Sequence, residues 1–235
     1  MTRFLMPILG VILAACSSGT DTLTVGAASS LTEVMDAVGD AFEGSGVIVS
    51  AAGSQVVAAQ VREGAPLDVV VTADEATIDR LAAGGLLAGE PVRIAGNRLV
   101  IVVAAGNPKG VAGLADLVRE DVTVVLAASQ VPAGAYAAET LAAAGIVVSP
   151  ASLEPSVRAV VAKVRLGEAD AGLAYATDIS ADVAAVELPP GVGTDASYFA
   201  AVVGATSHPE SARQFVDFLS SDRARAVFRT HGFAP

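Results

Sequence analysis

Hydrophobic positions follow two alternating patterns along most of the chain. Short, continuous apolar runs such as "DVVVTA" and "LVIVVAA" predict strands that are covered on both faces. Between these runs, apolar residues recur at helical spacing, as at Leu31, Val34 and Val38. We predict strands at 22–28, 47–51, 68–73, 98–104, 122–127, 170–175, 183–188 and 198–204. We predict helices at 30–42, 54–63, 75–83, 113–120, 134–144, 156–166, 209–220 and 222–230.

This order of elements predicts an α/β fold with a mainly parallel sheet. The last two helices have no new sheet to cover, so we expect them to pack on the first half of the chain. The runs at 98–104 and 198–204 would then cross between two lobes and leave a ligand cleft between them. We expect one lobe from 22–100 plus 202–235, and a second lobe from 101–201.

The N-terminus has the pattern of a secretory signal. Arg3 is followed by the apolar run "FLMPILGVILAA" and then by Cys16. The run is shorter than the roughly 20 residues that span a bilayer. "LAAC" resembles the bacterial lipobox, which predicts a signal peptide at 1–15, a lipidated Cys16 and a tether at 16–21. The alternative is an ordinary signal peptide with an incidental cysteine.

Composition and charge exclude several classes of protein. The chain has 235 residues, a formal net charge of -11 and 53% hydrophobic residues, without a basic cluster for a phosphate backbone. These values argue against nucleic-acid binding and against disorder. Catalytic and metal motifs are missing from the sequence, and its one cysteine and two histidines do not form a metal cluster. We expect His208 and His231 to be helix-end or surface residues, and we expect neither a cofactor nor a cation site.

Small and hydroxyl residues mark the starts of several predicted helices. Ser30 to Glu33 match a capping box, and Ser54 opens the second helix after a strand. Pro132 and Ala133 begin a third helix, and Ser156 with Val157 begins a fourth. Helices that follow parallel strands begin at one edge of the sheet, where α/β folds bind ligands. Their unpaired N–H groups can hold an anion without Lys or Arg, and serine hydroxyls add donors.

Several segments resemble the molybdate-binding proteins of ABC transporters. They are "AASSLTEVMD", "GSQVVAAQVREGAPLDVVVTAD", "QVPAGAYAAETL", "SVRAVVAKVRLGEADAGLAYATD" and "VFRTHGF". The resemblance implies two α/β lobes of the periplasmic-binding-protein type that close on tetrahedral molybdate or tungstate. The ligand positions that it implies are Ser30, Ser54, Ala133, Val157 and Tyr175.

The implied roles of these residues differ. The serines would supply hydroxyl and backbone donors, Ala133 and Val157 backbone N–H groups, and Tyr175 its phenol O–H. The residue pattern alone favours a buried core aromatic at Tyr175. The chain also departs from the family pattern at three positions. Ser29 stands where the family often has Ala and is either a further donor or faces the strand. Gly53 and Gln55 flank Ser54 where hydroxyls are common.

The resulting hypothesis is an extracytoplasmic receptor, anchored to the cell membrane through Cys16, that passes molybdate or tungstate to the permease and ATPase subunits of an ABC transporter. We expect a monomer that performs no chemistry on its ligand. The alternatives are a receptor for another tetrahedral oxyanion such as sulfate, a lipid-anchored serine hydrolase, and an adhesion or structural lipoprotein. Molybdate and tungstate nearly coincide in size and charge, so the sequence does not rank them.

Overall fold

The computed structural model describes residues 22–189 and 191–234, which form two α/β lobes. The predicted signal peptide, Cys16 and tether lie outside the described residues. The strands are β1 (Thr22–Ala28), β2 (Gly46–Ala52), β3 (Val69–Thr72), β4 (Val92–Asn97), β5 (Leu99–Ala104), β6 (Val124–Ala127), β7 (Ser152–Glu154), β8 (Ala171–Tyr175), β9 (Val183–Glu187) and β10 (Ala196–Val202). The helices are α1 (Thr32–Ala41), α2 (Ser54–Arg62), α3 (Glu75–Ala83), α4 (Pro132–Ala143), α5 (Val157–Arg165), α6 (Pro209–Leu219) and α7 (Asp222–Thr230). Short 3-10 helices are η1 (Ser29–Leu31), η2 (Leu114–Val118) and η3 (Ala176–Asp178). Among the described helices, none is long and apolar enough to cross a membrane.

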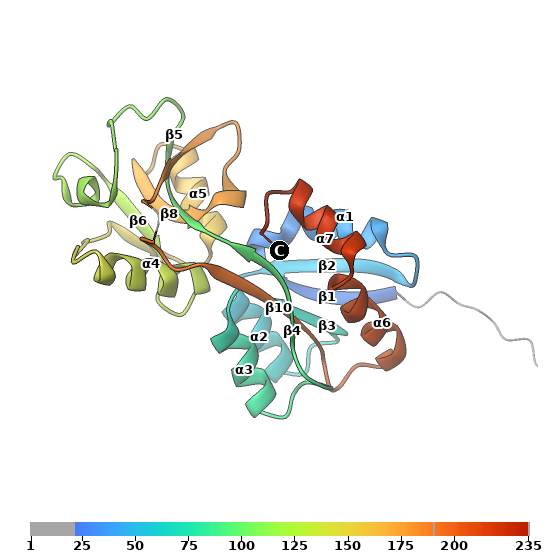
Figure 1. Cartoon of the computed structure of the whole chain (residues 1–235). Helices are drawn as coiled ribbons and strands as arrows, with labels where there is room; N and C mark the ends of the chain where they lie inside the picture. The colour runs from blue at the N-terminus through green and yellow to red at the C-terminus, as the bar shows by residue number, and fades with distance from the viewer. Residues whose placement is uncertain (1–21, 190, 235) are drawn as a thin grey trace, which may run out of the picture.

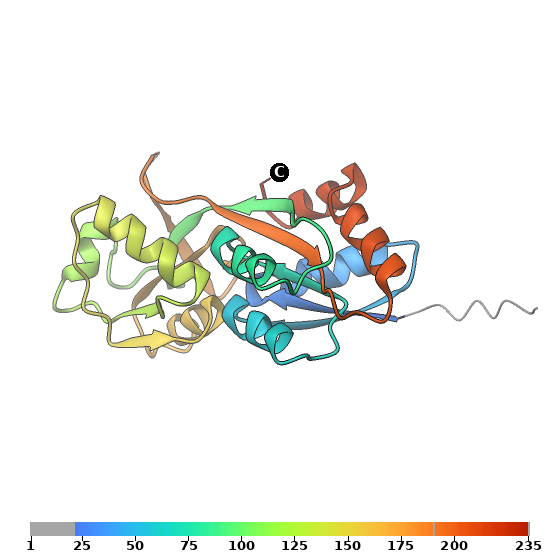
Figure 2. The same cartoon turned by 90° about the horizontal axis from the view of Figure 1, so that it is seen from below.

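The first lobe, called lobe I, is built on a sheet with the strand order β2-β1-β3-β10-β4. β1 pairs in parallel with β2 and β3, whereas β10 is antiparallel to β3 and β4. α1, α6 and α7 cover one face, where Phe215 and Phe228 pack into the same core as Val25. α2 and α3 cover the other face, where Val57 and Ile78 lie in one core cluster (Figure 2). The C-terminal helices therefore pack on the first half of the chain, as the sequence predicts.

The second lobe, called lobe II, is built on a sheet with the strand order β7-β6-β8-β5-β9. β6 is parallel to β7 and β8, and β5 is antiparallel to β8 and β9. α5 covers one face through Val160 and Val164, and α4 covers the other through Ala137 and Leu141. Continuous burial of β8 follows from this cover on both faces and explains its unbroken apolar run.

Two crossing segments connect the lobes (Figure 1). β4 of lobe I and β5 of lobe II are separated only by Arg98. The chain returns from β9 of lobe II to β10 of lobe I. Ala196 pairs with Asn97, and Arg98 forms an ion pair with Glu187 at 2.8 Å, so the two crossings lie side by side.

Some boundaries differ from the sequence prediction. Both crossings are shorter than the runs expected to cross: the first is at Arg98, because β5 runs entirely within the sheet of lobe II, and the second lies between β9 and β10, because β10 runs entirely within the sheet of lobe I. The sheets place residues 99–100 in lobe II and residues 196–201 in lobe I. The predicted division had assigned 99–100 to lobe I and 196–201 to lobe II. β4 and β7 are strands that the apolar pattern missed, and the helix expected at 113–120 is the shorter η2.

Asp68 is a buried carboxylate that joins three segments of lobe I. Its Oδ2 accepts a hydrogen bond from the Thr24 N–H at 2.8 Å, and its Oδ1 accepts one from the Thr206 hydroxyl. Nδ1 of His208 lies 3.1 Å from the same Oδ1. Burial acts to raise the pKa of Asp68, but the hydrogen bonds from Thr206, Thr24 and His208 outweigh it and lower the pKa below its ordinary value of 3.8. His208 thus precedes α6, as expected for a helix-end residue, while its ring contacts a buried acid rather than capping the helix.

Replacing Asp68 should destabilise the fold in a pH-dependent way. Because the folded pKa lies below the unfolded one, the charged group stabilises the fold above about pH 4, and this stabilisation is lost as the pH falls through the folded pKa. We expect Asp68→Asn to lower the free energy of unfolding by about 1–3 kcal/mol at pH 7. Melting curves from pH 7 to pH 3 should show this difference shrinking. Asp217→Asn, at an exposed position of α6, is the matched control. A difference that stayed constant across this range would contradict the assignment.

Candidate functional site

A small cavity lies between the lobes, and the space within it that the centre of a water molecule can reach is about 10 Å³. Every residue that lines it is buried. Lobe I contributes Ala28, Ser29, Ser30, Gly53, Ser54 and Ala73, and lobe II contributes Val131, Pro132, Ala133, Val157 and Tyr175. The structure therefore brings together all five ligand positions implied by the resemblance, and it places Ser29 with them.

The cavity forms where strands end and helices begin. In lobe I, the parallel strands β1, β2 and β3 lead into η1, into α2 and into the turn before α3. In lobe II, β6 leads toward α4, β7 toward α5, and β8 into η3. The carboxyl edges of the two parallel sets face each other across the cleft, which is where α/β sheets bind ligands.

The helix starts in lobe II present backbone donors. Ala133 is the second residue of α4, after Pro132 at the first position, and Val157 is the first residue of α5. N–H groups at these positions have no acceptor within the helix. The Ser156 hydroxyl accepts the N–H of Ala159 at 3.2 Å and not that of Val157, and Val157 lines the cavity. A Cβ on Gly134 would lie 2.1 Å from the Ala128 carbonyl oxygen, so only glycine lets α4 start this close to the end of β6.

The predicted capping box at Ser30 is wrong. Ser30 lies inside η1, and α1 begins two residues later without a side-chain cap. The 3-10 turn moves the hydroxyl away from the cap position, and Ser30 Oγ instead lies 3.0 Å from the Tyr198 phenol oxygen. Glu33 does not return to the cap backbone as predicted; its carboxylate pairs with Arg158 of lobe II.

The hydroxyls of the cavity are arranged to donate. Ser54 Oγ accepts the N–H of Ala73 at 3.1 Å, so its own proton remains for the cavity. The Tyr175 phenol is buried, and its oxygen has no hydrogen-bond partner within the described part of the chain. Burial raises the pKa of Tyr175 well above its ordinary value, so the phenol stays protonated at neutral pH. An orphaned buried hydroxyl is costly, and a ligand that accepts its hydrogen bond would remove that cost. The Tyr175 ring itself packs against Tyr198, as expected for a core aromatic.

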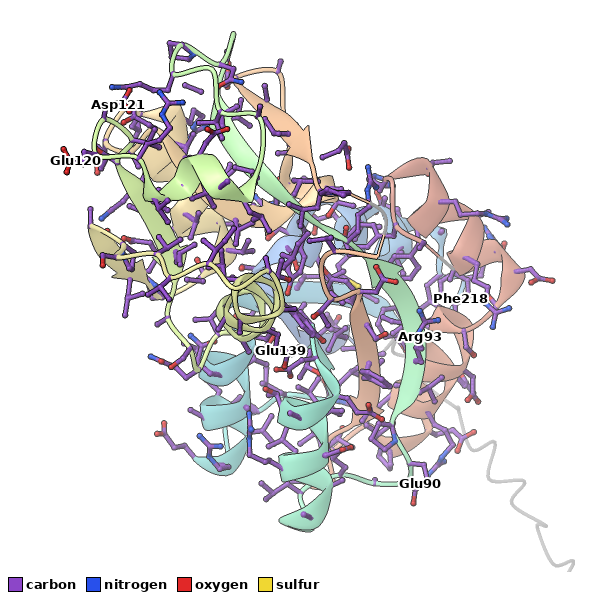
Figure 3. All side chains as sticks on the ribbon, turned by 60° about the vertical axis from the view of Figure 1, so that its left-hand side comes forward. Glu90, Arg93, Glu120, Asp121, Glu139 and Phe218 are labelled. Carbon is purple, nitrogen blue, oxygen red and sulfur yellow. The ribbon has the colours of Figure 1, made fainter. Side chains whose placement is uncertain are left out.

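Charged groups stand outside the cavity, and none of its described lining residues is charged. Figure 3 shows Glu120 and Asp121 at the outer end of lobe II and Glu90 at the far end of lobe I. Closer in, Oδ2 of Asp178 accepts the Tyr175 N–H at 3.2 Å. Burial raises the pKa of Asp178 to about 7, although the Tyr175 N–H and the charge of Arg158 act against this. A larger groove beside Asp178 has Arg158 and Glu33, which pair with each other, in its wall.

Contacts between the lobes hold the cavity closed. Nε of Arg158, on α5, donates to the Ser29 carbonyl oxygen at 2.7 Å. Nε2 of Gln55, on α2, donates to the Pro155 carbonyl oxygen at 2.8 Å. A Cβ on Gly53 would lie 2.8 Å from that same oxygen. Gly53 and Gln55 therefore occupy an interlobe contact, which gives their departure from the family pattern a structural role.

Sequence reasoning missed three residues around this site: Asn97, Arg158 and Tyr198. Tyr198 lies in an apolar strand and Arg158 on an amphipathic helix, so neither pattern indicates a role in the cleft. Asn97 is a polar residue between two apolar runs, and this signal could have been used. Neither histidine lines the cavity, and within residues 22–189 and 191–234 no group of His, Cys, Asp and Glu could hold a metal ion.

Comparison with known proteins agrees with this architecture. The family model of the bacterial extracellular solute-binding proteins matches residues 23–234. The molybdate-binding protein ModA of Mycobacterium tuberculosis is 39% identical over 225 residues, which cover 93% of this chain and 86% of the relative. The fold resembles the periplasmic molybdate-binding protein of Azotobacter vinelandii, with a TM-score of 0.78, 20% identity and coverage of 91% and 99%. It also resembles the sulfate-binding protein SubI of M. tuberculosis, with a TM-score of 0.76, 21% identity and coverage of 91% and 86%. The chain belongs to the family of bacterial extracellular solute-binding proteins.

Proposed function

We propose that this protein captures molybdate or tungstate in the cavity between its lobes and delivers the anion to an ABC transporter. The observation that carries the proposal is a cavity lined by donors and by buried residues, in which the Tyr175 hydroxyl lacks a partner within the described residues. Relatives that are named molybdate-binding proteins support the choice of ligand.

The donor set suits a tetrahedral dianion. Hydroxyl protons of Ser30, Ser54 and Tyr175 and the backbone N–H groups of Ala133 and Val157 would approach from separate segments. Ser29, which also lines the cavity, is a further donor in this proposal. Molybdate and tungstate carry only acceptor oxygens, whereas hydrogen phosphate carries a proton that needs an acceptor. Sulfate has the same charge in a smaller ion, so cavity size would have to reject it.

The proposal includes the setting of the receptor. The family indicates an extracytoplasmic location. We propose a monomer that is anchored to the cell membrane by lipid on Cys16 and works with permease and ATPase subunits. It uses no cofactor, contacts no nucleic acid and leaves its ligand chemically unchanged. A serine hydrolase would need a base beside a serine, and the cavity lining offers none.

Removing single hydroxyls should weaken binding. A hydrogen bond to a charged group is worth roughly 1.5–3 kcal/mol, so Ser54→Ala or Tyr175→Phe should each raise the molybdate Kd about 10- to 100-fold. Ser30→Ala should do the same without a loss of helix capping, because Ser30 does not cap α1. Calorimetry with molybdate, tungstate, sulfate and phosphate would measure this, and it would also rank sulfate as the alternative ligand. His231→Ala, at the exposed end of α7, is the control and should bind as the wild type does. Serine and tyrosine variants with unchanged affinity would refute the donor site.

Loss of an interlobe contact should weaken binding without touching the ligand. Arg158→Gln removes the bond to the Ser29 carbonyl and the pair with Glu33, which lowers the population of the closed form. We expect the molybdate Kd to rise roughly 5- to 30-fold, from a loss of about 1–2 kcal/mol. Small-angle scattering should show a smaller radius when molybdate is added. The variant should need a higher molybdate concentration to reach the same decrease. Arg165→Gln changes the same charge at the exposed end of the same helix and should have little effect. Equal affinities for the two variants would argue against closure by Arg158.

Processing at Cys16 can be tested separately. Mass spectrometry of the protein extracted from membranes should show a diacyl or triacyl Cys16 at the mature N-terminus, because one chain anchors only marginally. Cys16→Ala should abolish this modification and release the protein from the membrane fraction. A membrane-held mature form with an unmodified Cys16 would exclude the proposed anchor.

A further inference from the structure

Asn97, at the crossing between β4 and β5, has an orientation that can be assigned from its neighbours. It is buried, and its Oδ1 accepts the N–H of Arg98 at 2.9 Å. A backbone N–H can only donate, so the oxygen of the amide must lie on this side. Nδ2 therefore lies on the other side, where it donates to Thr177 Oγ1 at 2.7 Å and to the Tyr198 phenol oxygen at 3.3 Å.

Tyr198, on β10, receives this hydrogen bond in the core. Its side chain is fully buried, and its phenol oxygen has hydrogen bonds with Asn97 and, at 3.0 Å, with Ser30 Oγ. Because Asn97 Nδ2 only donates, the phenol oxygen accepts there, and its single proton goes to Ser30. The reverse direction would leave a buried phenol proton without an acceptor among the described hydrogen bonds. Burial raises the pKa of Tyr198, so this proton is present at any physiological pH.

The direction of this bond decides what Ser30 can offer to the cavity. Ser30 Oγ accepts from Tyr198, so its own proton is left for the cavity that it lines. Ser54 is in the same state, because its Oγ accepts the N–H of Ala73. We propose that Asn97 and Tyr198 are positioning residues that orient the Ser30 proton into the cavity and thereby make the site selective for fully deprotonated oxyanions. This inference deepens the proposed function and rests on its oxyanion ligand.

The selectivity follows from counting protons. Molybdate presents only lone pairs, so each hydroxyl proton that points into the cavity meets an acceptor. Hydrogen phosphate has the same charge but brings one proton, which needs a lone pair in the wall. With Ser30 held as a donor by Tyr198, its hydroxyl cannot turn to accept that proton without breaking a buried hydrogen bond. The ratio of the two affinities therefore reports the direction of the hydrogen bonds and not only the size of the cavity.

Two substitutions test the chain of hydrogen bonds. Asn97→Asp replaces the donor with a carboxylate that accepts from Tyr198, so that Ser30 must donate to the phenol oxygen and turn a lone pair to the cavity. We expect the molybdate Kd to rise about 10- to 100-fold and the preference for molybdate over hydrogen phosphate to fall at least about 10-fold at pH 8.5. Tyr198→Phe keeps the ring and frees Ser30 to rotate, so we expect the same preference to fall about 3- to 10-fold.

The double variant separates orientation from damage to the fold. With Phe at position 198 the carboxylate can no longer act through the phenol, so Asn97→Asp should change the preference less than about 2-fold further. Tyr136→Phe is the matched control, because this tyrosine bonds the Ser197 backbone and lies outside the chain to Ser30. It should leave the preference unchanged. If melting curves show that Asn97→Asp does not fold, the preference measured for Tyr198→Phe alone tests the inference.

The readout is calorimetry on the full mature chain with molybdate and with inorganic phosphate. The inference is supported if the preference for molybdate over phosphate falls in each single variant and if the double variant shows little further fall beyond Tyr198→Phe. Wild-type binding of molybdate together with an unchanged preference in Tyr198→Phe overturns the inference and leaves the proposed function standing. A wild-type protein that binds no molybdate overturns both.

Discussion

In the cavity between the lobes, an anion must be stabilised by neutral dipoles, because no positively charged side chain of the described residues lines it. Its described lining residues include neither Lys nor Arg, and the chain carries a formal net charge of -11. Backbone N–H groups at helix starts and hydroxyl protons can stabilise a buried anion only when many converge from different directions. This requirement explains why two sheets turn their carboxyl edges toward each other, and why neither lobe could provide the site alone. Of the acidic side chains labelled in Figure 3, Glu90, Glu120 and Asp121 lie at the outer ends of the two lobes.

Convergence from two sides requires two bodies that can approach closely and stay in register. The adjacent crossings at Arg98 and 188–195 restrict the lobes to an approach about one side of the molecule. Gly53 allows the approach because it leaves space for the Pro155 carbonyl, and Gln55 bonds the same oxygen once the lobes meet. Arg158 adds a charged contact from the helix whose first residue, Val157, lines the cavity. Closure and ligand contact thus share the same short segments.

Much of the fold could be read from the sequence, because continuous apolar runs and amphipathic stripes are local signals. β4 and β7 were not predicted, because neither forms an apolar run. β4 contains Arg93 and Gly96, and β7 has only three residues. The serines of the site were found because hydroxyls after strands mark helix starts. The function assigned to Ser30 as a cap was wrong, because a 3-10 turn cannot be distinguished from the first turn of an α-helix by residue type. Tyr198 and Asn97 could not be assigned to the site, since they lie 168 and 67 residues from Ser30 and only the sheet order brings them together.

Burial of the cavity has a consequence for the rate at which its contents exchange. All of the lining residues are buried in this structure, so an ion held among them would have little contact with bulk water until the lobes separate. The residence time of the ion is then limited by how often the contacts of Arg158 and Gln55 break together, and these residues do not line the cavity. Ions of different affinity would share this limit. A membrane partner that pulled the lobes apart could therefore empty the cavity quickly without competing for any of the bonds that hold the ion.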